Sequence, residues 1–366
     1  MQHIEHNREK RLFALLRMSL FNSCQEESLF ENMSNQDWSD IYTIALSQGV
    51  LAHTYDGLCH LRESLQPDLE IKIQWAYNVN HIEKLFKHQQ LVASELVTKF
   101  SEHNIKTIIL KGHSLAALYT RPDHRQAGDI DVYLMGDFER ANQIVQSSNI
   151  KVKYDYFVHS EFSIRGINIE NHRYFVNPFV NKAGKYVEEK LLELAPQSVA
   201  HTLIDGAYTL CPEAFALFFI RHSSWHYARE CISLRDICDW AMVLTQFESK
   251  IDFDSLKTML QQSGLDRYCY IITQICRQYL GVNSSLNFDN DYSELAERVK
   301  NDILTFCNPE KHTEMNFIRA FALKIRNRIS RKWCYDLVVP DSYWGNIWYS
   351  IKGYITNPIA IIKAKL

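Results

Sequence analysis

The sequence lacks an apolar run long enough to cross a bilayer. Its longest run, Ala214 to Ile220, is far shorter than the roughly 20 residues that a spanning helix needs. The first residues, Glu5 to Arg11, mix acidic and basic side chains and lack the apolar stretch of a secretion signal. These two absences favour a cytoplasmic protein, and they make membrane contact an unlikely role for the chain.

Neither sign of charge is in excess. The chain has 40 lysines and arginines against 43 acidic residues, which gives a net charge of -3. A dedicated nucleic-acid-binding protein usually carries a strongly basic face, so this balance argues against that class. A hydrophobic fraction of 46% and a charged fraction of 23% are ordinary for a globular chain, and 366 residues can form two or three domains.

The nine cysteines include no Cys-x-x-Cys pair, and their number is odd. Cys231 and Cys238 are seven residues apart, as are Cys269 and Cys276, which is the spacing of one helix face. We therefore expect buried reduced thiols rather than a disulfide framework or a metal site. Internal repeats, low-complexity segments and obvious flexible linkers are also absent, so the parts are expected to pack as one body.

The segment that carries chemistry begins with a strand and a turn. The apolar run from Ile108 to Leu110 predicts a strand, and the helical spacing of the apolar residues after Ser114 predicts a helix. Gly112, in the turn between them, lets the backbone approach a ligand, and the start of a helix favours an anion. With the Ser114 hydroxyl and the Lys111 charge, the pattern predicts a phosphate-binding turn.

A second strand pattern runs from Asp129 to Leu134. Alternation places Asp129 and Asp131 on one face of the strand and Ile130 and Val132 on the other. Two carboxylates held so close repel and raise each other's pKa unless a cation lies between them. Magnesium, which takes oxygen ligands and substrate phosphates, is the natural occupant.

These two motifs carry a resemblance. The sequence Gly112-His113-Ser114 followed by Asp129-Ile130-Asp131 resembles the nucleotidyltransferase signature of the DNA polymerase beta-like superfamily. The resemblance is closer still to a large, mostly uncharacterised bacterial nucleotidyltransferase family of that superfamily. It rests on the sequence Leu-Lys-Gly, on Arg125 in the spacer and on the sequence Gly-Asp-Ile-Asp. Fourteen residues separate Ser114 from Asp129, which is longer than the superfamily's usual spacer and similar to this branch.

The resemblance implies a fold and a reaction. The fold is α+β, with a small mixed β-sheet, and the reaction is metal-dependent transfer of a nucleotide from an NTP to a hydroxyl, with release of pyrophosphate. Asp129 and Asp131 would bridge two Mg²⁺ ions, or Mn²⁺ in their place. A third carboxylate on a neighbouring strand completes such a site, and Glu170, in an Ile-Glu-x-His sequence, is the candidate. Glu161 is the other carboxylate available.

The resemblance also implies nucleotide-binding residues. Gly112 and Ser114 would hold the β- and γ-phosphates. Lys111 and Arg125 would contact phosphate, although both could equally be surface charges. The acceptor is not indicated, and it could be a small molecule, a sugar or a protein. A non-catalytic nucleotide-binding or antitoxin-like interaction module with the same fold is the competing interpretation.

Periodicity organises the rest of the chain into three regions. We expect a helical N-terminal region at 1–105, a catalytic core at 106–205 and a helical C-terminal region at 206–366. Helical patterns include a capped start at Ser34, a long stretch over 71–100 and a pair over 213–229 and 233–244. Strand patterns follow the second motif at 151–158, 161–165 and 167–175.

Three features of the C-terminal region have competing interpretations. His222 and His226 have a spacing that can bind zinc, but no third ligand is evident, so a packed pair lining a cleft is preferred. Asp239 is expected to pair with Arg235 on its own helix or with a neighbouring helix. The aromatic segment 343–349 is expected to close the core rather than to rest on a membrane surface.

Overall fold

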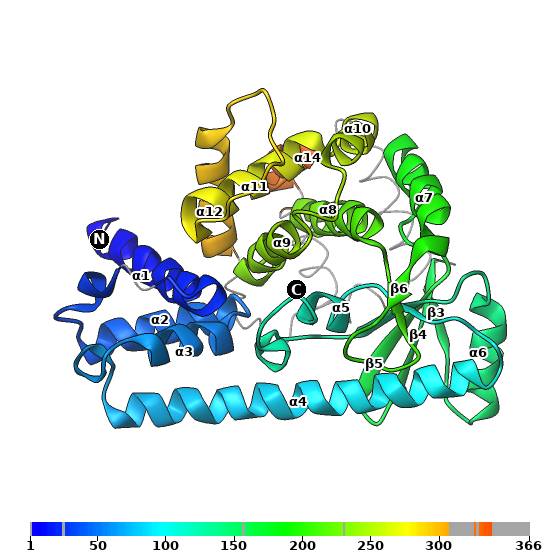
Figure 1. Cartoon of the computed structure of the whole chain (residues 1–366), viewed down its shortest axis with the longest axis horizontal. Helices are drawn as coiled ribbons and strands as arrows, with labels where there is room; N and C mark the ends of the chain where they lie inside the picture. The colour runs from blue at the N-terminus through cyan, green and yellow to red at the C-terminus, as the bar shows by residue number, and fades with distance from the viewer. Residues whose placement is uncertain are drawn as a thin grey trace.

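A seven-stranded mixed sheet forms the middle of the fold, with helices before and after it in the chain (Figure 1). The structure is a computed structural model, and it describes residues 2–23, 26–155, 158–229, 231–306, 326 and 329–338. The expected α+β fold with helical regions at both ends is confirmed.

The N-terminal region is helical, as the periodicity predicted. Its elements are α1 (Gln2–Phe21), η1 (Glu27–Phe30), α2 (Asn35–Ser47), α3 (Leu51–His60), η2 (Glu63–Leu65) and α4 (Leu69–Ser101). The start of α2 is fixed by the predicted cap, because Ser34 and Asp37 exchange side-chain and backbone hydrogen bonds. Helix α4 runs beneath both the N-terminal helices and the sheet (Figure 1).

The sheet has the order β3-β4-β5-β2-β1-β7-β6. Its strands are β1 (Ile108–Ile109), β2 (Ile130–Tyr133), β3 (Lys153–Asp155), β4 (His159–Ile164), β5 (Ile167–His172), β6 (Val199–Ala200) and β7 (Tyr208–Thr209). The central strand β2 pairs with β1 in the antiparallel direction and with β5 in the parallel direction. The two motif strands therefore lie at the middle of the sheet.

Short helices connect the strands. They are α5 (His113–Ala116), η3 (Pro122–His124), α6 (Phe138–Ser147), α7 (Lys182–Leu194) and η4 (Ala195–Gln197). Helix α5 follows the predicted turn but is a single turn long, and Pro122 opens the 3-10 helix η3 instead of ending α5. Helix α7 was not expected from the sequence.

The C-terminal region is also helical. Its elements are α8 (Pro212–Arg229), α9 (Leu234–Gln246), α10 (Phe253–Ser263), α11 (Asp266–Leu280), α12 (Ser293–Phe306) and α14 (Lys332–Val338). The aromatic segment 343–349 lies outside the described residues. No helix in the described part of the chain combines the length and apolar character needed to cross a membrane.

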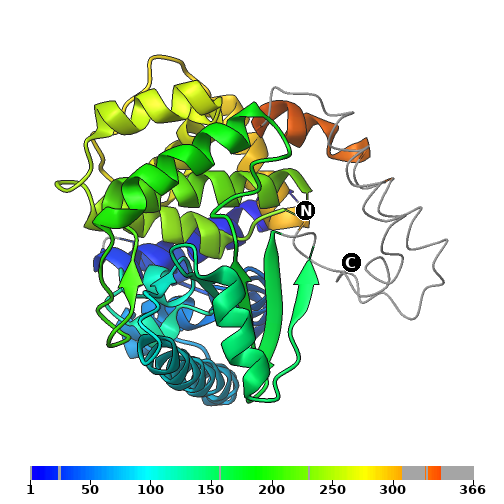
Figure 2. The same ribbon diagram turned by 90° about the vertical axis from the view of Figure 1, so that its right-hand side faces the viewer.

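Two apolar clusters form the core, and α4 belongs to both. The larger joins helices from the two ends of the chain, and it includes Leu15 of α1, Trp75 of α4 and Ile271 of α11. The smaller packs Leu96 of α4 against Val132 of β2 and its neighbours. Helix α4 thus fixes the sheet relative to the N-terminal helices (Figures 1 and 2). The seven described cysteines are free thiols, all buried except Cys59, in agreement with the expected reduced state.

The loop between α5 and β2 is anchored by a charged cluster. His124 of η3 contacts two carboxylates, with Nδ1 2.7 Å from Asp56 of α3 and Nε2 2.9 Å from Glu83 of α4. Arg121 also reaches both, at 3.7 Å and 2.9 Å, and lies 3.6 Å from Asp123. Glu83, Asp123 and His124 are close enough together to hold a metal ion, but the Arg121 guanidinium already supplies positive charge there.

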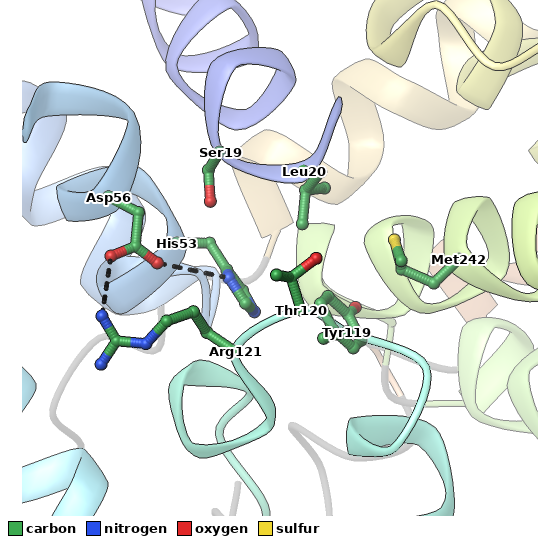
Figure 3. A pocket seen from close by; sticks show the side chains of 8 residues that line it. All are labelled: Ser19, Leu20, His53, Asp56, Tyr119, Thr120, Arg121 and Met242. Atoms are coloured by element: carbon green, nitrogen blue, oxygen red, sulfur yellow. Dashed lines mark ion pairs between the residues drawn. The ribbon is translucent and has the colours of Figure 1, made fainter. Parts of the chain in front are cut away.

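A small pocket lies beside this cluster (Figure 3). Asp56 points from α3 toward Arg121 on one side and toward His53 on the other, with ion-pair distances of 3.7 Å and 4.0 Å. The His53 ring stacks on Tyr119, and burial lowers the pKa of His53 to about 3, so its imidazole is neutral. The pocket is therefore part of the seam that joins α1, α3 and the loop.

The anchoring of His124 predicts a pH-dependent contribution to stability. Burial works to lower the pKa of His124, but the hydrogen bonds to Asp56 and Glu83 outweigh it, and the pKa is raised above its ordinary value of 6.5. A raised pKa in the folded state gives stability that is fully present below 6.5 and is lost as pH rises through the folded value. We expect His124→Gln to lower the melting temperature most at about pH 6 and least at about pH 9.

Thermal unfolding across this pH range, with the exposed His81→Gln as a control, measures the effect. The difference between wild type and His124→Gln isolates this residue from the other histidines. A difference that does not change with pH would show that the cluster does not depend on a charged imidazole.

Candidate active site

Polar side chains gather on one face of the sheet. The register places Asp131 of β2 beside Glu170 of β5, and Glu170 beside Glu161 of β4. The next row along the strands contains Tyr133, His172 and His159. The opposite face of β2 goes into the core through Ile130 and Val132, so the predicted alternation of this strand is confirmed.

Asp131 is the most buried of these carboxylates, and its side chain has no exposed area. Its Oδ1 accepts hydrogen bonds from Lys111 Nζ at 3.0 Å and from His172 Nε2 at 3.1 Å. Burial works to raise the pKa of Asp131, but the charges of Lys111 and His172 outweigh it and hold the pKa well below its ordinary range. Its other oxygen, Oδ2, is buried and has no hydrogen-bond partner in the described part of the chain.

The other two carboxylates are partly exposed. Asp129 comes directly before β2 and lies 3.9 Å from Lys111 Nζ; burial and the charge of Asp131 raise its pKa to about 6. Glu170 Oε2 lies 3.4 Å from His172 Nε2. Burial works to raise the pKa of Glu170, but the hydrogen bond to His172 lowers it by more. The predicted residues Asp129, Asp131 and Glu170 are thus brought together, and we call them the carboxylate site.

His172 and Lys111 balance the charge of the carboxylate site. Burial works to lower the pKa of His172, but its hydrogen bonds to Asp131 and Glu170 outweigh it and raise the pKa to about 9. Lys111 is held charged in the same way by Asp131 and Asp129, against the effect of burial. The sequence predicted that closely spaced carboxylates need positive charge between them. The Lys111 ammonium and the His172 imidazolium lie at that position.

The donor set fits a divalent cation. Ligand atoms of Asp131, Glu170 and His172 all lie within 4.8 Å of one another, so this group contains His172 in place of the predicted Asp129. The unpartnered Oδ2 of Asp131 is a buried anionic oxygen, which is costly unless a cation or a donor binds it. Carboxylate oxygens are the ligands that Mg²⁺ and Mn²⁺ prefer. The residues present are therefore suitable for the cation that the sequence predicted.

The turn before α5 requires a glycine. Gly112 has φ +61° and ψ −102°, a backbone conformation that side-chain-bearing residues rarely adopt. A Cβ there would lie 3.5 Å from the Asp129 carbonyl oxygen, an ordinary contact, so conformation rather than lack of space selects glycine. Ser114 is buried, and its hydroxyl donates to the Ile109 carbonyl at 2.7 Å. Its contact with a phosphate stays a prediction.

Arg125 lies in a buried ion pair. Its Nε and Nη2 donate to the two oxygens of Asp239 on α9, at 3.1 Å and 2.7 Å, and Tyr119 donates to the same carboxylate at 2.8 Å. Asp239 thus pairs with another element, whereas Arg235 donates to the Gln126 carbonyl at 3.4 Å. Of the alternatives left open for Asp239, pairing with Arg235 on the same helix is therefore replaced by pairing with the buried Arg125. A phosphate contact by Arg125 stays a prediction.

The backbone just before Asp129 is held from below by α4. The buried Gln89 donates to the carbonyl oxygens of Ala127 and Gly128. Together with Arg125 and the His124 cluster, this contact fixes the loop at both faces. The position of Asp129 is therefore set by residues far away in the sequence.

Helix α8 approaches the carboxylate site from the other side. His222 Nε2 lies 3.5 Å from Lys111 Nζ, and the rings of His222 and His226 are 4.4 Å apart. Burial and the nearby Lys111 hold the pKa of His222 well below its ordinary value, so its neutral ring accepts from the lysine. Among the described residues, no group of three metal ligands includes this pair.

Sequence reasoning missed some residues of this region. His172 shares the face of Glu170, and alternation showed this, but the sequence assigned it no contact with Asp131. Gln89 lies on a long helix with no local motif, and only the fold shows that it reaches the loop. The pairing of Arg125 with Asp239 is likewise a contact between distant segments.

Comparison with known proteins assigns the chain to a family. No curated protein matches the sequence. A crystal structure of an antigenic nucleotidyltransferase-like protein from Paracoccidioides brasiliensis matches with 15% identity and a TM-score of 0.31, over 54% of this chain and 93% of that chain. Residues 34–281, more than half of the chain and including the whole carboxylate site, match the model of a family described as uncharacterised nucleotidyltransferase. The chain belongs to this family of uncharacterised nucleotidyltransferases.

Proposed function

We propose that this protein transfers a nucleoside monophosphate from an NTP to a hydroxyl of an acceptor and releases pyrophosphate. The observation that carries the proposal is the buried, unpartnered Oδ2 of Asp131, in a carboxylate site next to the Gly112 turn. Family membership supports the class of reaction. The acceptor is a small molecule, a sugar or a protein.

Asp129, Asp131 and Glu170 would hold the metal. A divalent cation bound there, Mg²⁺ or Mn²⁺ and in the active complex two ions, would neutralise the triphosphate and stabilise the attacking and leaving oxygens. Since the reaction needs little covalent chemistry from the protein, these residues act mainly by positioning and charge.

The remaining roles fall to side chains around the carboxylate site. Lys111, the Gly112 backbone, Ser114 and Arg125 are the proposed nucleotide-binding residues. The Glu170 carboxylate, which the structure keeps ionised, takes the proton of the acceptor hydroxyl. The acceptor oxygen then forms a bond to the α-phosphorus, the bond to the β-phosphate oxygen breaks, and pyrophosphate leaves.

Lys111 has two possible partners in this scheme. Its side chain is 22% exposed, and its ammonium lies 3.0 Å from Asp131 Oδ1. A lysine has a flexible four-carbon stem, so the ammonium can turn toward a triphosphate once a divalent cation takes over the carboxylates. The contact seen here and the predicted phosphate contact are therefore compatible.

A non-catalytic nucleotide-binding or antitoxin-like module is the competing function. The observation in its favour is that Lys111 and His172 already balance the carboxylates, so the fold does not need a metal. A module of this kind would bind a partner without turnover. The two functions differ in whether a divalent cation binds the carboxylates.

The first test compares two amide variants. Asp129 is partly exposed and repelled by Asp131, so Asp129→Asn should leave the metal-free melting temperature unchanged or higher. Asp131→Asn leaves Lys111 and His172 without their shared partner and should destabilise the fold by about 3 kcal/mol. Both variants should lose the increase in NTP affinity that Mg²⁺ gives to wild type.

Calorimetry with each NTP, in Mg²⁺ and in EDTA, measures this effect beside thermal unfolding of the same samples. We expect wild type to bind at least one NTP about tenfold more tightly, or better, with Mg²⁺. Equal affinity in Mg²⁺ and EDTA, or full Mg²⁺ dependence in Asp129→Asn, would contradict the proposed metal role.

The second test uses Lys111→Met. Since the ammonium competes with a divalent cation for Asp131, its removal should tighten Mn²⁺ binding to the nucleotide-free protein by about tenfold. The free Mn²⁺ signal in electron paramagnetic resonance reports the affinity, and the exposed Lys99→Met is the charge-matched control. The non-catalytic module predicts no Mn²⁺ binding by either variant, and that result would argue against the enzyme.

A further inference from the structure

Arg221, in the middle of α8, is a buried arginine with no carboxylate partner among the described residues. It is 3% exposed, and its Nε and Nη1 atoms are buried with no hydrogen-bond partner in the described part of the chain. A guanidinium has five N–H donors and no acceptor, and burying such a charge unpaired is costly. Burial lowers the pKa of Arg221 to about 10, so it is still charged at neutral pH.

The other buried arginines of the described chain do have carboxylate partners. Arg125 is paired with Asp239, and Arg331 lies 3.0 Å from Asp302 and donates to the Tyr227 carbonyl at 2.7 Å. The fold can therefore satisfy a buried guanidinium, and at Arg221 it does not. An anion from outside the chain is the simplest missing partner.

The surroundings of Arg221 are cationic and aromatic. The guanidinium lies 5.1 Å from the Trp225 ring, and the Arg229 guanidinium lies 4.8 Å from the same ring. Such contacts recover part of the desolvation cost but give the N–H groups no acceptor. With Arg229 on the same ring, the local charge favours an anion.

Arg221 is also close to the elements that carry the carboxylate site. The next residue, His222, lies 3.5 Å from Lys111 Nζ. The Arg221 Nη2 atom lies 3.6 Å from the position of a Cβ on Gly184, in the first turn of α7. The segment that leads into α7 follows β5, the strand of Glu170 and His172. The guanidinium therefore lies beside the first turn of α7, the helix that follows β5 in the chain.

We propose that Arg221 binds a phosphate group of a substrate of the carboxylate site. The planar guanidinium can donate to two phosphate oxygens at once. A phosphate also supplies the negative charge that the described residues do not place beside Arg221. The phosphate is either the far end of the triphosphate or a phosphate carried by the acceptor. Its assignment to a substrate rests on the proposed nucleotidyl transfer, whereas binding of a phosphate by Arg221 does not.

The test uses the full chain with Arg221→Met, which removes the charge and keeps most of the side-chain volume. The probes are inorganic phosphate and Mg²⁺ with inorganic tripolyphosphate, which mimics a triphosphate tail whatever the base. We expect Arg221→Met to lower the affinity for at least one probe by about tenfold or more, which is the scale of one charged hydrogen bond. The melting temperature without probe should be unchanged or higher, since an uncompensated buried charge is removed.

Arg331→Met is the matched control, because it removes a buried arginine that has partners. It should lower the melting temperature and leave both probe affinities unchanged. Weaker tripolyphosphate binding in Arg221→Met assigns the residue to the triphosphate. Weaker phosphate binding with tripolyphosphate unchanged assigns it to a phosphorylated acceptor.

The proposal is overturned if Arg221→Met binds both probes as wild type does, or if wild type binds neither. It is also overturned if the variant unfolds as readily as Arg331→Met while both affinities are kept, since Arg221 would then be structural. Failure of the nucleotidyl transfer is a separate result. In that case NTP binding would not depend on metal, but the affinity for inorganic phosphate would still fall in Arg221→Met.

Discussion

The charge balance around Asp131 is the constraint on which the rest of the structure depends. A carboxylate with no exposed area must have positive charge beside it, and Lys111 and His172 supply that charge at 3.0 Å and 3.1 Å. One oxygen of Asp131 stays without a partner. Lys111 and His172 therefore compensate one oxygen of Asp131, and the other oxygen is available as a ligand for a further cation.

The scaffold serves to hold this charged group in place. Helix α4 joins the two apolar clusters and fixes the backbone before Asp129 through Gln89. Helix α9 holds the same loop through the Arg125–Asp239 pair, and α8 brings His222 to Lys111. The helices of both ends thus act on one short loop. Arg221 is the exception in this scaffold, because it is a buried charge that no other described residue balances.

The sequence predicted what depends on local pattern. The Gly112 turn and the alternation of β2 follow from residue order and strand geometry, and the place of Glu170 beside Asp131 was implied by the family resemblance. Contacts between distant segments could not be predicted, and Arg125 with Asp239 is an example. Helix α7 was missed because Gly184 lies in its first turn, and only the Asn181 side chain, which accepts from the Gly184 N–H, caps it. The missing carboxylate partner of Arg221 among the described residues also has no signal in the sequence.

Mass spectrometry of reaction products tests the central claim most directly. The wild-type chain is incubated with each NTP, Mg²⁺ and a cell extract, and Asp131→Asn is treated in the same way. The account predicts a species heavier by one nucleoside monophosphate and a matching amount of pyrophosphate, both from wild type alone. A wild-type sample without any nucleotide adduct or pyrophosphate, or an adduct formed equally by Asp131→Asn, would contradict it.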